Sequence, residues 1–160
     1  MKPGLFAFEM CSSVVVDVPV QRAWEVVADA SRWPAWSEVC TAVWGSPESS
    51  DDWEVGKKFG FRLRMAKRNV PFNVTVIRIE PTHLTERLIE WTSTKFTISA
   101  VRTISVSAES EHGPEGCRVT DRKLFSSPFL PIGLVYPTGL IRRMTESWLY
   151  DLKQEAESCS

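Results

Sequence analysis

The stretch VDVPVQRAWEVVADASRWPAW, residues 16–36, decides the fold of this chain. Residues 5–18 are rich in Phe and Val and predict a strand that stops at Pro19, because proline has no N–H to donate to a sheet. Residues 20–30 predict a helix, because apolar residues three and four apart form one stripe: Ala23, Trp24, Val27 and Ala28. Pro34 allows only a short turn or helix next. A strand followed by two short helices is an uncommon order of elements, so it narrows the number of folds that the chain can adopt.

The middle of the chain, from residue 39 to about residue 127, is typical of β-structure. In KKFGFRLRM, residues 57–65, aromatic and aliphatic residues alternate with basic ones, which predicts one dry and one solvated face. The expected strands are 39–44, 57–65, 70–80, 84–92, 95–108 and 117–125. The breaks between them have hairpin length, so we expect an antiparallel meander: 45–56, 66–70, 81–83, 92–95 and 109–116.

The C-terminal part of the chain changes period. Apolar residues recur at steps of three and four and predict a long amphipathic helix: Leu140, Ile141, Met144, Trp148, Leu152 and Ala156. Only the sheet is large enough to cover this apolar face. We therefore expect an α+β fold in which residues 1–160 form a single domain. A curved antiparallel sheet of about seven strands would wrap around the C-terminal helix and enclose an apolar cavity.

Composition and charge exclude several classes of function. The formal net charge of the 160 residues is −1, which provides no bulk attraction to nucleic acid. The chain contains no apolar run long enough to cross a bilayer and no signal-like N-terminus, so we expect a cytoplasmic protein without stable membrane insertion. Seven Trp and eight Phe are many for this length, and such rings fill a core or line an apolar ligand site. The sequence does not indicate an oligomeric state.

Metal and cofactor chemistry find no support in the sequence. The histidines are His83, in a PTHL turn, and His112, in a Gly/Pro loop, and neither has a ligand partner at metal-binding spacing. Motifs for phosphate, dinucleotide or nucleophilic chemistry are absent from the sequence, so we expect neither a metal nor a cofactor. The cysteines are widely spaced and predict reduced structural thiols: Cys11, Cys40, Cys117 and Cys159.

Three charged residues fall on the apolar parity of the last two expected strands. Arg102 alternates with Ile98, Ala100, Ile104 and Val106, and Asp121 and Lys123 alternate with Val119 and Phe125. The two strands are hairpin neighbours, so an Arg102–Asp121–Lys123 cluster is expected in or at the mouth of the cavity. One interpretation is a polar anchor for a ligand carbonyl, phenolate or carboxylate. The other is an edge network with solvent access, or a parity shifted by a bulge.

The aromatic and long apolar residues supply the candidate ligand contacts. We expect core or cavity-wall positions for Phe59, Phe61, Trp91, Ile141, Met144 and Trp148. Trp33 and Trp36 are equally consistent with core packing and with a cap at one end of the cavity. The Pro/Gly-rich segment 126–140 is interpreted as a rim over the opening, with Phe129 and Tyr136, or as a packed connector.

Several segments resemble the START-like, helix-grip or SRPBCC superfamily, which includes the birch-pollen-allergen fold, polyketide cyclase/dehydrase proteins and coenzyme Q-binding START-domain proteins. In its opening segment, a strand ends at a Pro, an aromatic anchors the first helix and an Asp precedes a Trp-containing turn: Pro19, Trp24, Asp29 and Trp36 occupy these places. The other similar segments are EVGKKFGFRLRM (54–65), VIRIEP (76–81), GCRVTDRKLFSSP (116–128) and LIRRMTESWLYDLKQEAES (140–158). The resemblance implies the helix-grip fold over nearly the whole chain and leaves function open.

Three functional hypotheses follow. The first is a protein that binds a small hydrophobic or aromatic molecule, polyketide-like or lipid-like, in the cavity between sheet and helix. The alternative is an enzyme of the polyketide cyclase/dehydratase kind that uses the same cavity for acid/base-assisted cyclisation, with Asp121, Lys123, Arg102 and Tyr136 as candidate catalytic residues. A chaperone-regulating or interaction domain would need an exposed apolar patch. Whether a ligand leaves the protein unchanged or altered distinguishes the first two hypotheses.

Overall fold

The computed structural model describes residues 6–80, 86–95, 97–109 and 115–158. The strands are β1 (Ala7–Val16), β2 (Cys40–Trp44), β3 (Lys58–Met65), β4 (Arg68–Glu80), β5 (Glu86–Lys95), β6 (Ile98–Ala108) and β7 (Cys117–Ser126). The helices are α1 (Val20–Ala28), α2 (Trp33–Trp36), α3 (Ile132–Val135) and α4 (Thr138–Ser158), with 3₁₀ turns η1 (Ala30–Arg32) and η2 (Ser50–Asp52).

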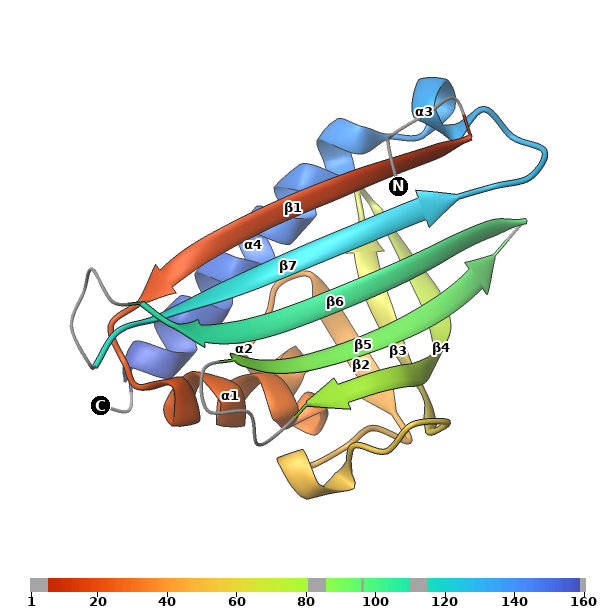
Figure 1. The fold of residues 1–160 in the computed structure, drawn as a ribbon. Coiled ribbons are helices and arrows are strands. Elements are labelled where there is room, and N and C mark those ends of the chain that lie inside the picture. The colour runs from red at the N-terminus through yellow and green to blue at the C-terminus, as the bar shows by residue number, and fades with distance from the viewer. Residues whose placement is uncertain (1–5, 81–85, 96, 110–114, 159–160) are drawn as a thin grey trace.

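The strands form one antiparallel sheet in the order β1-β7-β6-β5-β4-β3-β2 (Figure 1). From β2 to β7 the sheet is the expected meander, because each strand pairs with the next one along the chain. Strand β1 forms the edge opposite β2 by pairing with β7, from Ala7 opposite Ser126 to Val16 opposite Cys117. This pairing places β7 inside the sheet, between β1 and β6.

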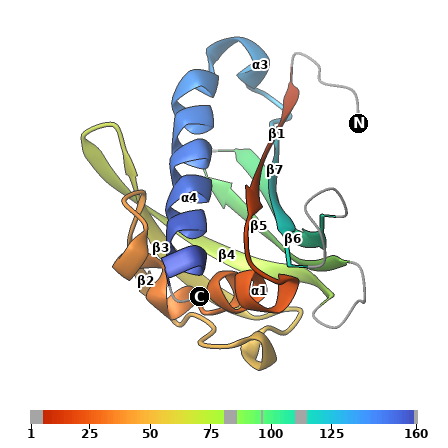
Figure 2. The same cartoon turned by 90° about the vertical axis from the view of Figure 1, so that its left-hand side faces the viewer.

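Helix α4 lies across the concave face of the curved sheet, with β1 and β7 on one side and β2 and β3 on the other (Figure 2). Its apolar stripe is buried: Ile141, Trp148, Leu149, Leu152 and Ala156. Helix α1 packs against the C-terminal end of α4, where Arg22 donates to the carbonyl oxygens of Glu155 and Ala156, each at 3.4 Å. A cation that satisfies the last carbonyls of a helix also complements the helix dipole. The predicted α+β helix-grip architecture is confirmed.

Two hairpins are tighter than the sequence predicts. Met65 pairs with Arg68 and Lys95 pairs with Ile98, so two-residue turns replace the wider breaks expected at 66–70 and 92–95. Ala66 and Thr97 have positive φ values of 56° and 65°. Tight hairpin turns require such angles, and Gly or Asn usually provides them. The sequence signal for these turns is weak because neither position carries one of these residues.

Segment 45–56, expected to be only a turn, contributes a large core residue. The Trp53 side chain is 5% exposed and its indole donates to the carbonyl oxygen of Ala28 at 2.8 Å. The Trp33 indole donates to the carbonyl oxygen of Val27 at 3.1 Å. Both carbonyls lie at the end of α1, where no following helical turn supplies an N–H to donate to them. The two tryptophans therefore terminate α1 and anchor η1, α2 and the segment after β2 in one core.

Segment 126–140 contains helix α3, which the sequence analysis did not predict. Ile132 at its start is fully buried, in a cluster with Phe8, Met10, Phe125 and Ile141. The segment therefore packs onto β1, β7 and α4 through this residue. The burial of Ile132 supports the interpretation of this segment as a packed connector.

Candidate functional site

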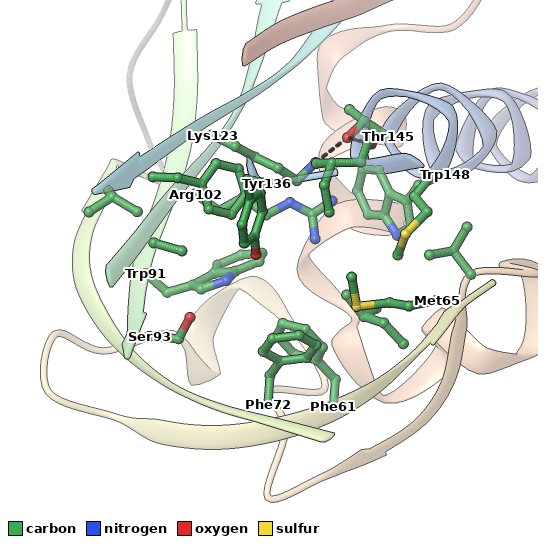
Figure 3. A pocket seen from close by; sticks show the side chains of 17 residues that line it. Phe61, Met65, Phe72, Trp91, Ser93, Arg102, Lys123, Tyr136, Thr145 and Trp148 are labelled. Atoms are coloured by element: carbon green, nitrogen blue, oxygen red, sulfur yellow. Dashed lines mark hydrogen bonds between the residues drawn. The ribbon is translucent and has the colours of Figure 1, made fainter. Parts of the chain in front are cut away.

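A cavity separates the concave face of the sheet from the first half of α4 (Figure 3). Its volume is about 90 Å³. One water needs roughly 10–15 Å³, so the cavity has room for several waters. Most of its wall is apolar, including Phe61, Leu63, Met65, Phe72, Trp91, Ala100, Phe125, Ile141, Met144 and Trp148. The polar side chains in the wall are Ser93, Arg102, Lys123, Tyr136 and Thr145.

The expected cluster of charged residues is present on this face. Arg102 pairs across the sheet with Lys123, and Asp121 pairs with Ile104, so Arg102 and Asp121 are diagonal neighbours. Arg102 Nη2 donates to Asp121 Oδ2 at 2.7 Å, and Arg102 Nε donates to Oδ1 at 3.1 Å. The Asp121 side chain is fully buried and the Arg102 side chain is 11% exposed. Because β7 lies between two other strands, the alternative of an edge network with solvent access is wrong.

The pKa of Asp121 is lowered by its two cationic neighbours. Burial by itself raises the pKa of this carboxyl, but the charges and hydrogen bonds of Arg102 and Lys123 together outweigh burial. The carboxylate is therefore ionised at neutral pH and committed to both cations. Asp121 is not part of the cavity wall, whereas Arg102 and Lys123 are, so the carboxylate lies behind these two cations.

Lys123 connects the sheet to α4 across the cavity. Its Nζ donates to Thr145 Oγ1 at 2.6 Å (Figure 3) and to Asp121 Oδ2 at 3.0 Å. The Thr145 hydroxyl donates to the carbonyl oxygen of Ile141 at 2.8 Å. Burial is the main cause that lowers the pKa of Lys123 to about 8. Asp121 opposes this shift, and Arg102 adds to it. Lys123 therefore changes charge closer to neutral pH than an ordinary lysine does.

The Arg102 guanidinium lies between two indoles. Its central carbon is 5.3 Å from the ring centroid of Trp91 and 4.7 Å from that of Trp148. Cation–π contacts of this kind hold a guanidinium in an apolar environment. Asp121 and the two rings thus position Arg102 in the wall of the cavity.

Tyr136 forms part of the wall at the α3 end. Its ring lies 5.1 Å from that of Phe125 and 5.6 Å from that of Phe8. Burial raises the pKa of its hydroxyl, so the phenol stays protonated at neutral pH. The phenol can therefore donate a hydrogen bond at neutral pH but does not serve as a base there.

The structure brings together six of the predicted ligand-binding residues. The cavity wall contains Phe61, Trp91, Tyr136, Ile141, Met144 and Trp148. Trp33 and Phe59 are instead packed in the main core, with ring centroids 6.1 Å apart. Trp36 packs beside this core, 5.4 Å from Trp148. Phe129 is 76% exposed and lies outside the wall. Ligand contact remains a prediction for the six residues in the wall.

Thr145, like Ser93, is a polar wall residue that the sequence analysis missed. It lies four residues after Ile141 and three before Trp148, on the buried stripe of α4, and is 1% exposed. A hydroxyl inside an otherwise apolar helical stripe is the signal that indicates it. Its role becomes visible only when β7 faces α4, because its partner Lys123 lies 22 positions away.

Some sequence predictions lie outside the described residues, namely those on His83, His112 and Cys159. Within the described ranges, His, Cys, Asp and Glu side chains form no group of three that could hold a metal ion. Cys40 and Cys117 are buried free thiols, and burial raises the pKa of each to about 11. No helix in the described parts of the chain combines the length and apolar character that a bilayer crossing requires.

Comparison with known structures shows the same architecture in other proteins. A START superfamily protein from Mycobacterium smegmatis superposes with a TM-score of 0.74 at 14% identity, covering 95% of this chain and 99% of the other. The Zhui aromatase/cyclase from a Streptomyces species gives 0.71 at 14% identity, covering 94% of each chain. Norcoclaurine synthase from Thalictrum flavum gives 0.66 at 13% identity, covering 96% of this chain and 99% of the other. At these identities the likeness shows the fold alone.

Sequence comparison with known families is more specific. No curated protein sequence matches the chain significantly. The family described as polyketide cyclase/dehydrase and lipid transport matches residues 7–157, from the first residue of β1 almost to the end of α4. Together with the seven-stranded sheet gripping α4, this match confirms the suspected START-like superfamily. The chain belongs to the polyketide cyclase/dehydrase and lipid transport family.

Proposed function

We propose that the protein binds a small hydrophobic or aromatic molecule in the cavity between the sheet and α4. The observation that carries this proposal is an apolar hollow in the interior, with a few polar groups converging on it. Protein interiors pack to crystal-like density and contain few voids larger than a water molecule. An apolar cavity with a few placed polar groups is the usual form of a small-molecule site. The family description, which combines cyclases with lipid transport, supports the same class of ligand.

The dimensions of the cavity favour a compact ligand. Its roughly 90 Å³ favours a single ring over a larger body. A longer polyketide-like or lipid-like chain needs wall side chains to move. Met65 and Met144 are suited to such movement because methionine is unbranched and adapts to irregular shapes.

Filling the cavity from α4 tests this proposal. We expect nitrobenzene, a neutral one-ring molecule, to bind the wild-type protein saturably and to quench Trp emission, because Trp91 and Trp148 line the cavity. Met144→Trp places an indole in this space and should weaken binding at least about tenfold in calorimetric titration. Tyr150→Trp is the matched control, since Tyr150 is on the same helix and 61% exposed. Equal binding by both variants, or no saturable binding by the wild type, would contradict the proposal.

A second candidate function is proton transfer to a bound polyketone, as in a cyclase or dehydratase. The observation that favours it is the buried Lys123 amine at the cavity wall with a pKa of about 8. Among the four candidate catalytic residues it is the suitable one, because Asp121 is committed to two cations, Arg102 remains charged and Tyr136 stays protonated. A proton donor or acceptor works best with a pKa near the working pH.

Mass spectrometry of a recovered ligand separates the two candidate functions. A diketone thioester incubated with a cyclising dehydratase is recovered lighter by one water. A binding protein returns it unchanged. Lys123→Met should abolish the loss of water if Lys123 transfers the proton.

A further inference from the structure

We infer that the cavity selects an anionic ligand, an organic acid whose apolar body carries one carboxylate. This inference rests on the proposed binding function and specifies the chemical class of the ligand. It follows from the charges in and behind the cavity wall, from their hydrogen bonds and from the charges of a groove beside the cavity.

The wall contains cations and no carboxylate. Arg102 and Lys123 both line the cavity, whereas Asp121, the carboxylate that contacts them, lies behind them. Two positive charges therefore face one negative charge. The shifted pKa of Lys123 has contributions from Asp121 and Arg102 and from no other charged group in the described part of the chain. Among the described residues, one positive charge at the wall is therefore left without a partner anion.

The unused hydrogen-bonding capacity is on the cations. Asp121 accepts from Nε and Nη2 of Arg102, and among the described residues nothing accepts from the Nη1 group. Lys123 uses two of its three ammonium protons, on Asp121 and on Thr145. A carboxylate accepts several hydrogen bonds and prefers charged donors. An anionic ligand group at this wall would therefore complete both the charge balance and the hydrogen bonds.

The apolar surroundings strengthen this preference. A surplus charge in an apolar site lacks the solvation of water, and its attraction to an opposite charge is weakly screened there. Burial already disfavours the charged form of Lys123. A bound carboxylate would favour the charged form and raise that pKa. Wall aromatics such as Phe61 and Phe72, which lie opposite Lys123 in Figure 3, suit an apolar body attached to the anion.

A groove beside the cavity carries the same sign of charge. This shallow groove shares Val39 and Met144 with the cavity wall. The groove is lined by Arg64 and Arg143 with one carboxylate, Glu38. A surplus of positive charge beside a site raises the local concentration of anions. Both the groove and the cavity therefore favour an acid over a neutral molecule of the same shape.

A pair of isosteric probes tests the inference. Para-nitrobenzoate and para-nitrobenzamide have the same ring and nearly the same shape, and only the first is charged at neutral pH. We expect the wild-type protein to bind the benzoate at least about tenfold more tightly in calorimetric titration. Lys123→Met should reduce this preference to less than about threefold while the benzamide still binds. Arg142→Met, which removes a charge from an exposed position of α4, is the matched control and should keep the preference.

The pH dependence of the wild type gives a second test that needs no variant. From about pH 6.5 to about pH 9.5 the benzoate stays ionised, whereas Lys123 loses its proton above its pKa of about 8. Benzoate affinity should therefore fall above about pH 8 while benzamide affinity stays constant. The fall in benzoate affinity continues above pH 8, because bound benzoate raises the pKa of Lys123.

The outcomes separate the two claims. If neither probe binds, the proposed binding function fails. If both bind equally, or the benzoate preference is unchanged at high pH and in Lys123→Met, the binding function stands and the inference is overturned. Competition by inorganic phosphate as strong as that by the benzoate would also overturn it, because the site would then recognise charge without the apolar body.

Discussion

Asp121→Asn is expected to lower the free energy of unfolding by about 3–5 kcal/mol, because it leaves Arg102 and Lys123 inside the protein without their carboxylate. Asparagine has nearly the same volume, so the loss is electrostatic rather than a packing defect. Urea unfolding at neutral pH measures it. The matched control is Glu9→Gln, which removes an ion pair with the exposed Arg122 on the neighbouring strands and should cost less than about 1 kcal/mol.

The double variant tests the cause of that loss. Asp121→Asn combined with Lys123→Met removes one cation together with the carboxylate. It should recover part of the stability that Asp121→Asn loses. If the double variant is no more stable than the single one, uncompensated positive charge is not the cause. A cost of Asp121→Asn below about 1 kcal/mol would show that the two cations do not depend on this carboxylate.

The pH dependence of this difference has a defined sign. The pKa of Asp121 in the folded protein is below its ordinary value, which is about 3.9 in unfolded chains. The unfolded state therefore binds the proton first as the pH falls. The stabilisation by Asp121 is fully present above about pH 4 and is lost as the pH falls through the folded pKa. The difference in stability between wild type and Asp121→Asn should shrink over that acidic range.

Trp148→Ala is expected to destabilise the protein by about 3–5 kcal/mol. The Trp148 side chain is 2% exposed and its ring packs against Trp33 and Trp36, with centroids at 6.1 Å and 5.4 Å. It also covers the Arg102 guanidinium from the α4 side. Truncation removes buried apolar surface, enlarges the cavity and deprives the cation of an aromatic contact. Thermal or urea unfolding measures the sum of these losses.

The control for Trp148→Ala comes from the same helix. Tyr150 is 61% exposed, so Tyr150→Ala should change stability by no more than about 0.5 kcal/mol. A cost of Trp148→Ala below about 1 kcal/mol would show that the ring serves only the cavity wall. In that case the core around Trp33 would not depend on α4.

The sequence determined most of the fold because secondary structure leaves a local signal. The period-two alternation in residues 57–65 placed Phe59 and Phe61 on the buried face of β3, and both are buried. The spacing of three and four residues in α4 identified the stripe that the sheet covers. The hairpins at Ala66 and Thr97 escaped this reasoning because their backbone angles come without the usual turn residues.

The candidate site was predictable in part for the same reason. Parity along two neighbouring strands places Arg102, Asp121 and Lys123 on one face, and the ion pairs among them follow from hairpin pairing. Thr145 escaped because it belongs to a different element. Its hydrogen bond to Lys123 exists only once α4 has packed on the sheet.

Only the tertiary structure decided which buried residues surround empty space and which fill the core. Phe59 and Phe61 share one face of β3, yet Phe59 packs on Trp53 at 5.5 Å whereas Phe61 lines the cavity. Asp121 and Lys123 share one face of β7, yet the carboxylate lies behind the wall and the ammonium is part of it. Strand periodicity specifies a face, which is a local property of the backbone. The distance between that face and α4 depends on the curvature of the whole sheet and on how the large side chains between the two layers pack, and no local sequence pattern specifies it.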